Sequence, residues 1–400
     1  LFAYRKLQDT AADCEDRCDQ IEREMRDPKA AKRFALKQSQ AFVDQMEGFA
    51  LELEDELMNF SDVSYKSFVK SESEIITLFY DKFADIPLLS RMDAVAETFI
   101  DEIETLLNRD LPEEERMPLI EKFRRMYETM DFYVLYNRFL KKEGYQTLPR
   151  RPLEKRKLRY EDVYPVLYLK YRLSRQAERS NIKHLVIDEM QDYSRLQYLM
   201  IRRMFSCKMT ILGDRAQTMA DRQQDVLQFL PGIFGKDLRR IEMRKSYRNT
   251  VEIASYAANL IGVTDLELFE RHGMPVLERD EADLACALRE AADALFPSEK
   301  TYETAAVIVP DEKTAERAYL LLREILGSKG FDCEKRLSWL NRDSSSFQKG
   351  LTVTTFYLAK GLEFDQVFSI FPKDEKREMM MQARYIAATR ALHELWVYSI

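Results

Sequence analysis

One segment constrains the fold of this chain more than any other: an apolar run that ends in two adjacent carboxylates. Residues 182–187 have the apolar character of a buried strand, and Asp188 and Glu189 follow directly. Side chains at the carboxyl ends of strands in an open α/β sheet face the ligand crevice. One acid placed there can hold a hydrated Mg²⁺ ion, and a second can orient an attacking water. The alternative is an acidic strand end beside a helix that Asp192 or Ser194 caps.

Strands and helices alternate after residue 160, which is typical of βα units in a parallel sheet. We therefore expect an α/β fold. The expected elements are strand 182–187, helix 194–204, strand 209–213, helix 222–230, strand 238–243, helix 250–261, helix 284–295, strand 304–309, helix 314–326, strand 351–355, strand 367–371, helix 376–392 and strand 395–399.

The first 150 residues have a different, helical pattern. Phe42, Met46, Phe49, Leu53 and Leu57 recur at helical spacing and build one apolar stripe. A second stripe consists of Met92, Val95, Phe99, Ile103 and Leu106, and a capping box is expected where Ser71 precedes Glu74 by three residues. We interpret the stripes as packing faces, so this region is predicted to be an all-helical subdomain without chemistry of its own.

Charge is unevenly distributed along the chain. The net charge is −7, so the chain as a whole does not indicate nucleic-acid binding. Residues 141–160 nevertheless hold eight basic residues against Glu143 and Glu154: Lys141, Lys142, Arg150, Arg151, Lys155, Arg156, Lys157 and Arg159. Such a cluster could follow a phosphate backbone. A solvated connector is the equally weighted alternative.

Two further observations bear on the cellular compartment. No apolar run approaches the ~20 residues that a bilayer crossing needs, and the amino terminus shows no charged-then-apolar signal pattern. The five cysteines are odd in number and widely scattered, which favours free thiols in a reducing compartment: Cys14, Cys18, Cys207, Cys286 and Cys333. We therefore expect a cytoplasmic protein with no membrane partner.

Four more stretches follow the acidic strand end in a fixed order. They are Thr210-Ile211-Leu212-Gly213-Asp214-Arg215-Ala216-Gln217, then Arg244 to Thr250 (RKSYRNT), Thr352 to Asp365 (TVTTFYLAKGLEFD) and Tyr385 to Leu392 (YIAATRAL). With residues 182–192 they resemble motifs II to VI of the UvrD/Rep-like superfamily 1 DNA helicases. Any one motif is weak evidence, but five in order are specific. The resemblance runs from residue 182 to residue 400.

The resemblance implies an ATP-dependent helicase or translocase that uses Mg²⁺ and binds DNA, as a single strand or a duplex junction. It implies two RecA-like parallel-sheet motor domains, the first incomplete here. Residues 1–150 occupy the place of the helical 1B subdomain in that family. Residues 151–248 would be the second half of the first motor domain, and residues 249–400 the second motor domain.

The resemblance also assigns roles around the phosphates of the nucleotide. Asp188 would hold Mg²⁺, and Glu189 would act as the general base on the attacking water. Gln217 matches the residue that senses the γ-phosphate. Arg248 and Arg390 match two arginines that reach the γ-phosphate from either side of the cleft, where an arginine can be worth ~10³–10⁵ in rate.

Four further residues would contact the nucleoside or the nucleic acid. Tyr247 would stack on adenine, although a core aromatic at a helix start is an equally weighted alternative. Glu363 matches a residue near the ribose, and Gly361 permits close backbone approach. Thr355 matches a residue that contacts a nucleic-acid phosphate.

The chain departs from the family pattern at several points. Tyr357 replaces the usual His after Thr355, and Thr218-Met219-Ala220-Asp221 lacks the aromatic residues on which bases stack. The interval between Arg248 and Thr355 is too short for the large 2B insertion of UvrD and Rep. This short interval resembles the HelD-like subgroup most, together with the stretches Leu158-Arg159-Tyr160-Glu161-Asp162, Ile182-Lys183-His184 and Leu358-Ala359-Lys360-Gly361. Members of that subgroup bind RNA polymerase and release it from nucleic acid, so RNA polymerase is the alternative partner.

A further departure concerns the phosphate loop. No Gly-x-x-x-x-Gly-Lys-Ser/Thr occurs among the 400 residues, and the string from Gly232 to Asp237 has the wrong spacing. A fragment of a longer motor, a degenerate scaffold and a loop supplied by a partner are the three explanations. Retention of the downstream residues favours the fragment, so we expect negligible ATP hydrolysis by this chain alone.

Overall fold

The computed structural model describes residues 6–175, 181–214, 217, 226–243, 245–263, 267–296, 302–344, 348–373 and 378–400. They form two compact units. Unit 1 comprises residues 1–187, 193–211 and 229–235, and unit 2 comprises residues 188–192, 212–228 and 236–400. Within the described residues, no helix is long and apolar enough to cross a membrane.

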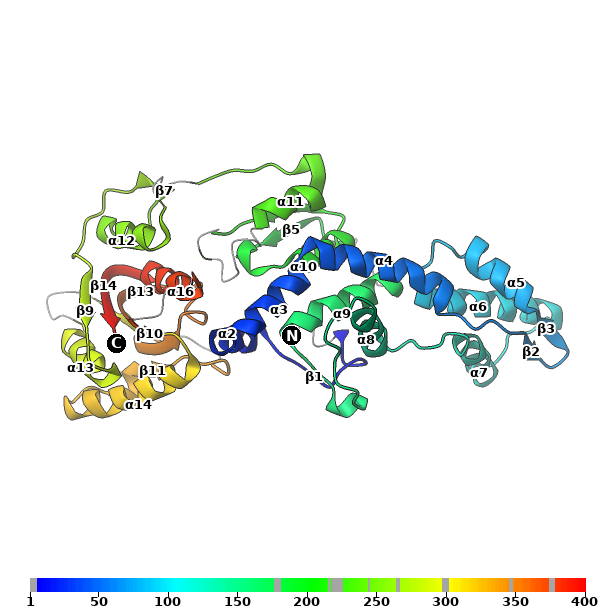
Figure 1. Ribbon diagram of the computed structural model, residues 1–400, viewed down its shortest axis with the longest axis horizontal. Coiled ribbons are helices and arrows are strands. Elements are labelled where there is room, and N and C mark those ends of the chain that lie inside the picture. The colour runs from blue at the N-terminus through cyan, green and yellow to red at the C-terminus, as the bar shows by residue number, and fades with distance from the viewer. Residues whose placement is uncertain are drawn as a thin grey trace. The chain divides into compact units, whose positions relative to one another are not determined.

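Unit 1 is mainly helical (Figure 1). Its helices are α2 (Arg17–Arg26), α3 (Pro28–Gln38), α4 (Gln40–Glu56), α5 (Glu72–Thr77), the π-helix η1 (Leu78–Lys82), α6 (Leu88–Leu107), α7 (Glu113–Arg124), α8 (Phe132–Lys142), the short 3-10 helix η2 (Leu153–Lys155), α9 (Tyr160–Leu173) and α10 (Arg195–Met204). Short strands accompany them: β1 (Asp13–Cys14) pairs with β4 (Lys157–Leu158), and β2 (Val63–Tyr65) forms an antiparallel ribbon with β3 (Phe68–Lys70). The sequence predicted no strand in this region.

The two predicted apolar stripes form the core of unit 1. All five residues of the first stripe are buried along α4, and Met92, Val95, Phe99 and Ile103 are buried along α6. Leu106 is 71% exposed, so its assignment to the second stripe was wrong. It lies in the last turn of α6, beyond the packed part of the helix. The capping box of Ser71 and Glu74 at the start of α5 is confirmed.

A buried set of ion pairs joins the first turn of α9 to the helices around it. Glu161 accepts a 2.9 Å hydrogen bond from Arg23 Nη1 of α2. Asp162 pairs with Lys37 of α3 and accepts a 2.8 Å hydrogen bond from Tyr136 of α8. Buried carboxylates are tolerated only when paired in this way, so these contacts fix the register of four helices.

A two-stranded parallel sheet ends unit 1 and leads into the site. Strand β5 (His184–Ile187) pairs in register with β6 (Lys208–Ile211), and α10 connects them as in a βα unit. Helix α10 begins with a capping box of Ser194 and Gln197. The two strands and the helix confirm the predicted elements to within two residues. Helix α11 (Val226–Phe234) and the 3-10 helix η6 (Gly235–Asp237) follow.

Unit 2 is built on one parallel sheet of six described strands. Their order is β11-β12-β10-β13-β14-β9. The strands are β9 (Leu277–Asp280), β10 (Thr304–Val309), β11 (Leu337–Trp339), β12 (Gly350–Thr355), β13 (Phe364–Phe371) and β14 (Ala391–Ser399). A separate pair consists of β7 (Lys245–Ser246) and β8 (Glu267–Leu268). The mixed α/β class and the parallel sheet confirm the predicted fold class.

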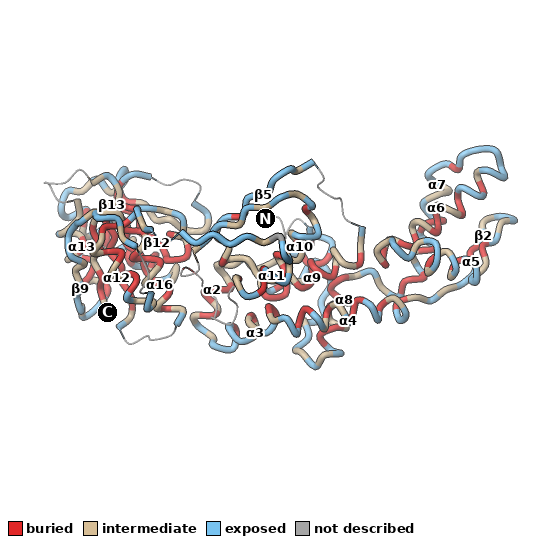
Figure 2. Tube along the Cα trace, turned by 90° about the horizontal axis from the view of Figure 1, so that it is seen from above, coloured by how far each residue is buried: buried red, intermediate tan, exposed pale blue. Residues whose placement is uncertain are grey.

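Helices cover both faces of this sheet (Figure 1). Helix α13 (Leu284–Ala294) packs on α14 (Glu312–Ser328), and α12 (Val251–Ile261) packs on α16 (Glu378–Thr389), while the short α15 (Cys333–Arg336) precedes β11. Residues 305–309 in the central strand β10 are all buried, as expected for a parallel strand covered on both sides. Figure 2 shows this buried interior along β12 and β13.

Two expected elements were wrong. Residues 238–243 form no strand, and Ile241 and Met243 are about nine-tenths exposed. Helix α16 ends at Thr389 rather than at residue 392, because Ala391 already pairs with Phe364 in the sheet. The start of the expected helix 376–392 and residues 222–225 of the expected helix 222–230 lie outside the described residues.

Candidate functional site

The acidic turn after β5 is the first part of the site. Asp188 Oδ1 accepts a 2.8 Å hydrogen bond from the Glu189 amide, and the Glu189 carbonyl accepts one of 2.9 Å from Asp192 N. Glu189 adopts a left-handed backbone with φ of +52°, which is uncommon for a residue other than glycine. Such a strained position is typical of functional sites.

Gly213 allows the acidic turn to pack against the segment that begins at Leu212. The amide of Met190 donates a 2.8 Å hydrogen bond to the Leu212 carbonyl. A Cβ atom on Gly213 would lie 2.4 Å from Gln191 Oε1 and 2.7 Å from Met190 N. Only a residue without a side chain fits there, which explains the glycine of the Gly-Asp pair in physical terms.

Lys360 connects the acidic turn to the segment after β12. Its Nζ lies 2.6 Å from Asp192 Oδ1 and 3.5 Å from Glu189 Oε2. It also donates a 3.4 Å hydrogen bond to the Gln217 carbonyl, and its side chain is only 7% exposed. Lys360 and Asp192 were missed as site residues. The available signal was the position of the lysine directly before Gly361.

Gln217 and Arg390 contact each other directly. Arg390 Nη2 donates a 3.2 Å hydrogen bond to Gln217 Oε1, and Gln217 Nε2 donates one of 3.0 Å to Asp214 Oδ2. Arg390 lies in the turn between α16 and β14 and is 1% exposed. Its remaining N–H groups donate to the Leu362 and Ile386 carbonyls and to Thr389 Oγ1.

Burial and the charges of neighbouring side chains shift the pKa of Arg390. Burial lowers the pKa of its guanidinium, and the positive charge of Arg248 lowers it further, whereas Glu189 and Glu363 act in the opposite direction. Electrostatic coupling thus reaches from Arg390 to predicted site residues on three other segments. Tyr385 donates a 3.3 Å hydrogen bond to Asp214, and burial, followed by the charge of Asp214, raises the pKa of this tyrosine.

Arg248 and Glu363 form an ion pair at the edge of this cluster. Arg248 Nε lies 2.8 Å from Glu363 Oε1, with both side chains a little under half exposed. The segment is held in place by Asn249, whose Nδ2 donates a 2.6 Å hydrogen bond to the Ala391 carbonyl. Arg271 also donates to the Arg248 carbonyl.

The three remaining predicted residues differ in their surroundings. Tyr247 is 61% exposed, so it is not a core residue, and its ring centroid lies 5.6 Å from that of Phe269. Gly361 has φ of +82° and open space around it. Thr355 is fully buried at the end of β12, and its hydroxyl has no hydrogen-bond partner among the described residues.

The donor set fits one part of a magnesium nucleoside triphosphate. Two guanidinium groups and an amide side chain suit an anionic phosphoryl group, and carboxylates suit Mg²⁺. Asp188, Glu189, Gln217, Arg248 and Arg390 all belong to unit 2, although they come from three separate segments of the chain. These residue types therefore suit a terminal phosphate, although the described residues include no group of three or more acidic, His or Cys side chains that could hold a metal by itself. The sequence of 400 residues has no Gly-x-x-x-x-Gly-Lys-Ser/Thr motif for the inner phosphates.

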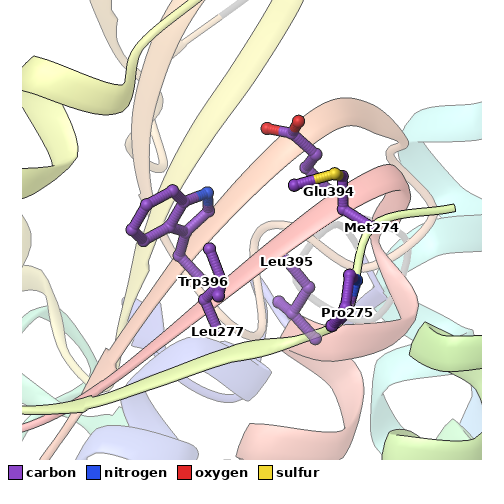
Figure 3. A pocket seen from close by; sticks show the side chains of 6 residues that line it. All are labelled: Met274, Pro275, Leu277, Glu394, Leu395 and Trp396. Carbon is purple, nitrogen blue, oxygen red and sulfur yellow. The ribbon is translucent and has the colours of Figure 1, made fainter.

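A small pocket in unit 2 lies away from these residues. It is lined by Met274, Pro275, Leu277, Glu394, Leu395 and Trp396, at the edge of the sheet where β9 pairs with β14 (Figure 3). None of the predicted site residues lines it, and apart from Glu394 its lining is apolar. Glu394 accepts a 2.8 Å hydrogen bond from Gln366, and the lining has no basic residue that could bind a phosphate.

Comparison with protein families gave two matches. Residues 2–219 match the model of the UvrD/REP helicase N-terminal domain, which is more than half of the chain. Residues 350–398 match the UvrD-like helicase C-terminal domain. The first match includes the acidic turn and Gln217, and the second includes Thr355, Lys360 and Arg390. No match was found among curated proteins.

Solved structures with similarity to the chain include three helicases. The C-terminal domain of a possible DNA helicase from Lactobacillus plantarum WCFS1 is 22% identical, with 39% of this chain and 88% of that chain covered and a TM-score of 0.30. The PRRSV helicase is 14% identical, with 67% of this chain and 45% of that chain covered and a TM-score of 0.31. Arterivirus nonstructural protein 10 (helicase), solved in complex with DNA, is also 14% identical, with 67% of this chain and 51% of that chain covered and a TM-score of 0.30. The chain spans about half the length of these two viral helicases.

Proposed function

Because the chain belongs to the UvrD/Rep helicase family, we propose that it is part of an ATP-dependent DNA helicase or translocase, in which ATP hydrolysis with Mg²⁺ is coupled to movement on nucleic acid. The observation that carries this proposal is the hydrogen bond between Gln217 and Arg390. Lys360 forms ion pairs with Glu189 and Asp192 in the same cluster. Residues separated by more than 170 positions thus converge on one cluster of charges.

We assign the residues around the terminal phosphate as follows. Asp188 would hold the metal, and Glu189 would take the proton of the attacking water. The bound metal would neutralise charge on the phosphate oxygens. Arg248 and Arg390 would stabilise the charge on the transferred phosphoryl group, with Gln217 orienting the Arg390 guanidinium through the observed hydrogen bond.

Tyr247 and Glu363 are the residues that we propose to contact the nucleoside. The exposure of Tyr247 supports stacking on adenine, because a buried ring would not be available. Arg248 and Glu363 now neutralise each other, so we propose that nucleotide binding exchanges this ion pair for contacts with phosphate and ribose. Thr355 would contact a nucleic-acid phosphate once its segment exposes the hydroxyl that now lacks a partner.

We also propose the division into a helical 1B-like subdomain at residues 1–150, the C-terminal half of a first motor domain at 151–248 and a second motor domain at 249–400. The mainly helical elements up to α8 and the six-stranded sheet within residues 277–399 support it.

The test is the Glu189→Gln substitution in the full-length protein. We expect DNA-stimulated ATP hydrolysis to fall about 10²–10⁴-fold, because the amide cannot accept the proton of water. Glu316→Gln, an exposed acid on α14, is the matched control and should retain full activity. Melting temperatures of both variants should equal that of the wild type.

Two results would count against the motor. One is unchanged hydrolysis in the Glu189→Gln protein. The other is a Glu189→Gln protein that loses ATP hydrolysis and keeps its full biological activity. That result would favour the HelD-like alternative, a protein that acts by binding RNA polymerase. Robust ATP hydrolysis by the isolated 400-residue chain would contradict the need for a phosphate loop.

A further inference from the structure

We propose that residues 149–159, the basic loop between α8 and α9, are a docking surface for the phosphate backbone of a nucleic acid. The loop belongs to unit 1, whereas the predicted phosphate-handling residues belong to unit 2. It is therefore a separate surface, and the proposed function enters only in the choice of nucleic acid as the partner.

The first argument is the surplus of unpaired positive charge. Two basic residues of the loop are paired: Arg156 with Asp131, and Lys157 with Asp13. Four others are exposed and form no ion pair with any described residue: Arg150, Arg151, Lys155 and Arg159. The single acid within the loop is Glu154. In a chain with a net charge of −7, this is a local concentration of exposed positive charge.

The second argument is that the start of the loop is held in place. Tyr133 of α8 donates a 2.8 Å hydrogen bond to the Pro149 carbonyl, and Asn137 Oδ1 accepts one of 2.7 Å from Leu148 N. The Arg156 guanidinium lies 4.5 Å above the Tyr133 ring and donates a 3.0 Å hydrogen bond to the Arg151 carbonyl. Pro149 and Pro152 restrict the backbone further.

The far end of the loop is fixed by a short β ladder. Strand β4 pairs with β1, with hydrogen bonds of 3.0 Å from Ala12 N to the Arg156 carbonyl and 2.9 Å from Glu15 N to the Leu158 carbonyl. The loop is thus anchored at both ends and across its middle. This contradicts the alternative of a loosely solvated connector. An anchored cationic loop loses less conformational entropy when it binds.

The third argument distinguishes phosphates from a protein partner. Protein interfaces depend on buried apolar and aromatic anchors. Leu153, at 38% exposure, is the only large apolar side chain that the loop exposes. Arginine suits phosphate because its planar fork donates two parallel hydrogen bonds. The loop therefore fits a ligand recognised by charge and independent of base sequence.

The experiment compares two triple variants of the protein. Arg150→Gln, Arg151→Gln and Lys155→Gln remove charge from the loop. Lys29→Gln, Lys32→Gln and Arg125→Gln remove the same charge from exposed positions elsewhere in unit 1. Binding of a fluorescein-labelled single strand of about 20 nucleotides, long enough to span several phosphate contacts, is measured by anisotropy at several KCl concentrations. Melting temperatures check that both variants fold.

Each lost phosphate contact lowers the salt dependence, d log K/d log[KCl], by about 0.7 for a single strand. The loop variant should therefore show a slope smaller by about 2 and roughly tenfold to hundredfold weaker binding at ~0.1 M KCl. The control should bind like the wild type. Equal affinities and slopes for the two variants would overturn the proposal, as would absence of DNA binding by the wild type.

Two further readouts separate this inference from the proposed function and from a protein partner. Binding by the loop variants is measured without ATP, whereas the proposed function is tested by ATP hydrolysis, so failed ATP hydrolysis and failed loop binding are distinguishable. Poly-L-glutamate serves as an acidic polypeptide probe. If the loop variant lost binding to that probe and kept its DNA affinity, the surface would belong to a protein partner and the inference would be wrong.

Discussion

At the scale of single residues, two positions near the site require glycine for different physical reasons. Gly361 has φ of +82°, a backbone conformation that an L side chain adopts only with strain. Gly213 has no such constraint, but a Cβ atom there would collide with the backbone of Met190. The first position is restricted by its backbone and the second by its neighbours.

We predict that Gly213→Ala destabilises unit 2 by about 1–3 kcal/mol, because the acidic turn must shift to admit the methyl group. Gly327→Ala is the control from the same unit. This glycine lies within α14, and a methyl group there would meet open space, so alanine should stabilise the helix by about 0.5–1 kcal/mol. Urea unfolding of both variants measures the difference, and equal shifts would show the packing argument to be wrong.

The sequence predicted individual site residues better than it predicted the contacts between them. The pattern of residues pointed to Gln217 and Arg390, and the structure joins them by a hydrogen bond. Lys360 was missed, because its importance depends on acids 168 and 171 positions away that are close only in the folded chain. The buried, partnerless hydroxyl of Thr355 could not be predicted either, since burial there is decided by long-range packing.

At the scale of elements, helix α12 shows how a helix start is anchored to a distant loop. Glu252 lies in its first turn and contacts two residues after β8. Its Oε1 lies 2.9 Å from His272 Nδ1, and its Oε2 accepts a 2.9 Å hydrogen bond from Gly273 N. Burial alone would raise the pKa of Glu252, but these hydrogen bonds, with that of its own amide, lower it from 4.5 to about 2.

This lowered pKa predicts a pH-dependent contribution to stability. The folded state prefers the ionised carboxylate, so the contribution is complete above about pH 4.5 and is lost as the pH falls from there towards about 2. We expect wild type to melt above Glu252→Gln at about pH 6, with the difference shrinking between about pH 4.5 and about pH 3. A difference that stayed constant over that range would contradict the assignment.

The elements that sequence predicted best are those whose pattern reflects burial on both sides. Strand β10 was predicted with correct bounds because its run of apolar residues admits one interpretation in a parallel sheet. Residues 238–243 mix apolar and charged side chains and find no neighbouring strand in the described chain, so Ile241 and Met243 stay exposed. Local pattern cannot report whether a pairing partner exists. Likewise, α16 ends earlier than expected because Ala391 pairs with Phe364 in the sheet.

At the scale of the whole molecule, the chain passes between its two units five times, near residues 187, 192, 211, 228 and 235. The six strands of the large sheet nevertheless all lie after residue 276. The helices that cover its faces, α12, α13, α14 and α16, all lie after residue 250. A core with both faces covered is the requirement for independent folding.

We predict that a fragment of residues 250–400 folds by itself and unfolds cooperatively. Arg390 would lose its bond to Gln217 but keep its acceptors at Leu362, Ile386 and Thr389. A fragment of residues 302–400 is the control, and it should not fold because it lacks α12, α13 and β9. Thermal melting followed by circular dichroism tests both, and a non-cooperative melt of the longer fragment would contradict the prediction.

The ammonium group of Lys360 has one further consequence. It pairs with Glu189 and Asp192, on the same turn as Asp188, which is expected to hold a metal, and it lies five residues after Thr355, which is expected to meet nucleic acid. A divalent cation held by Asp188 would add positive charge to the turn that this lysine contacts. Binding of the metal nucleotide and displacement of the segment that carries Lys360 and Thr355 would then be coupled by repulsion between two cations.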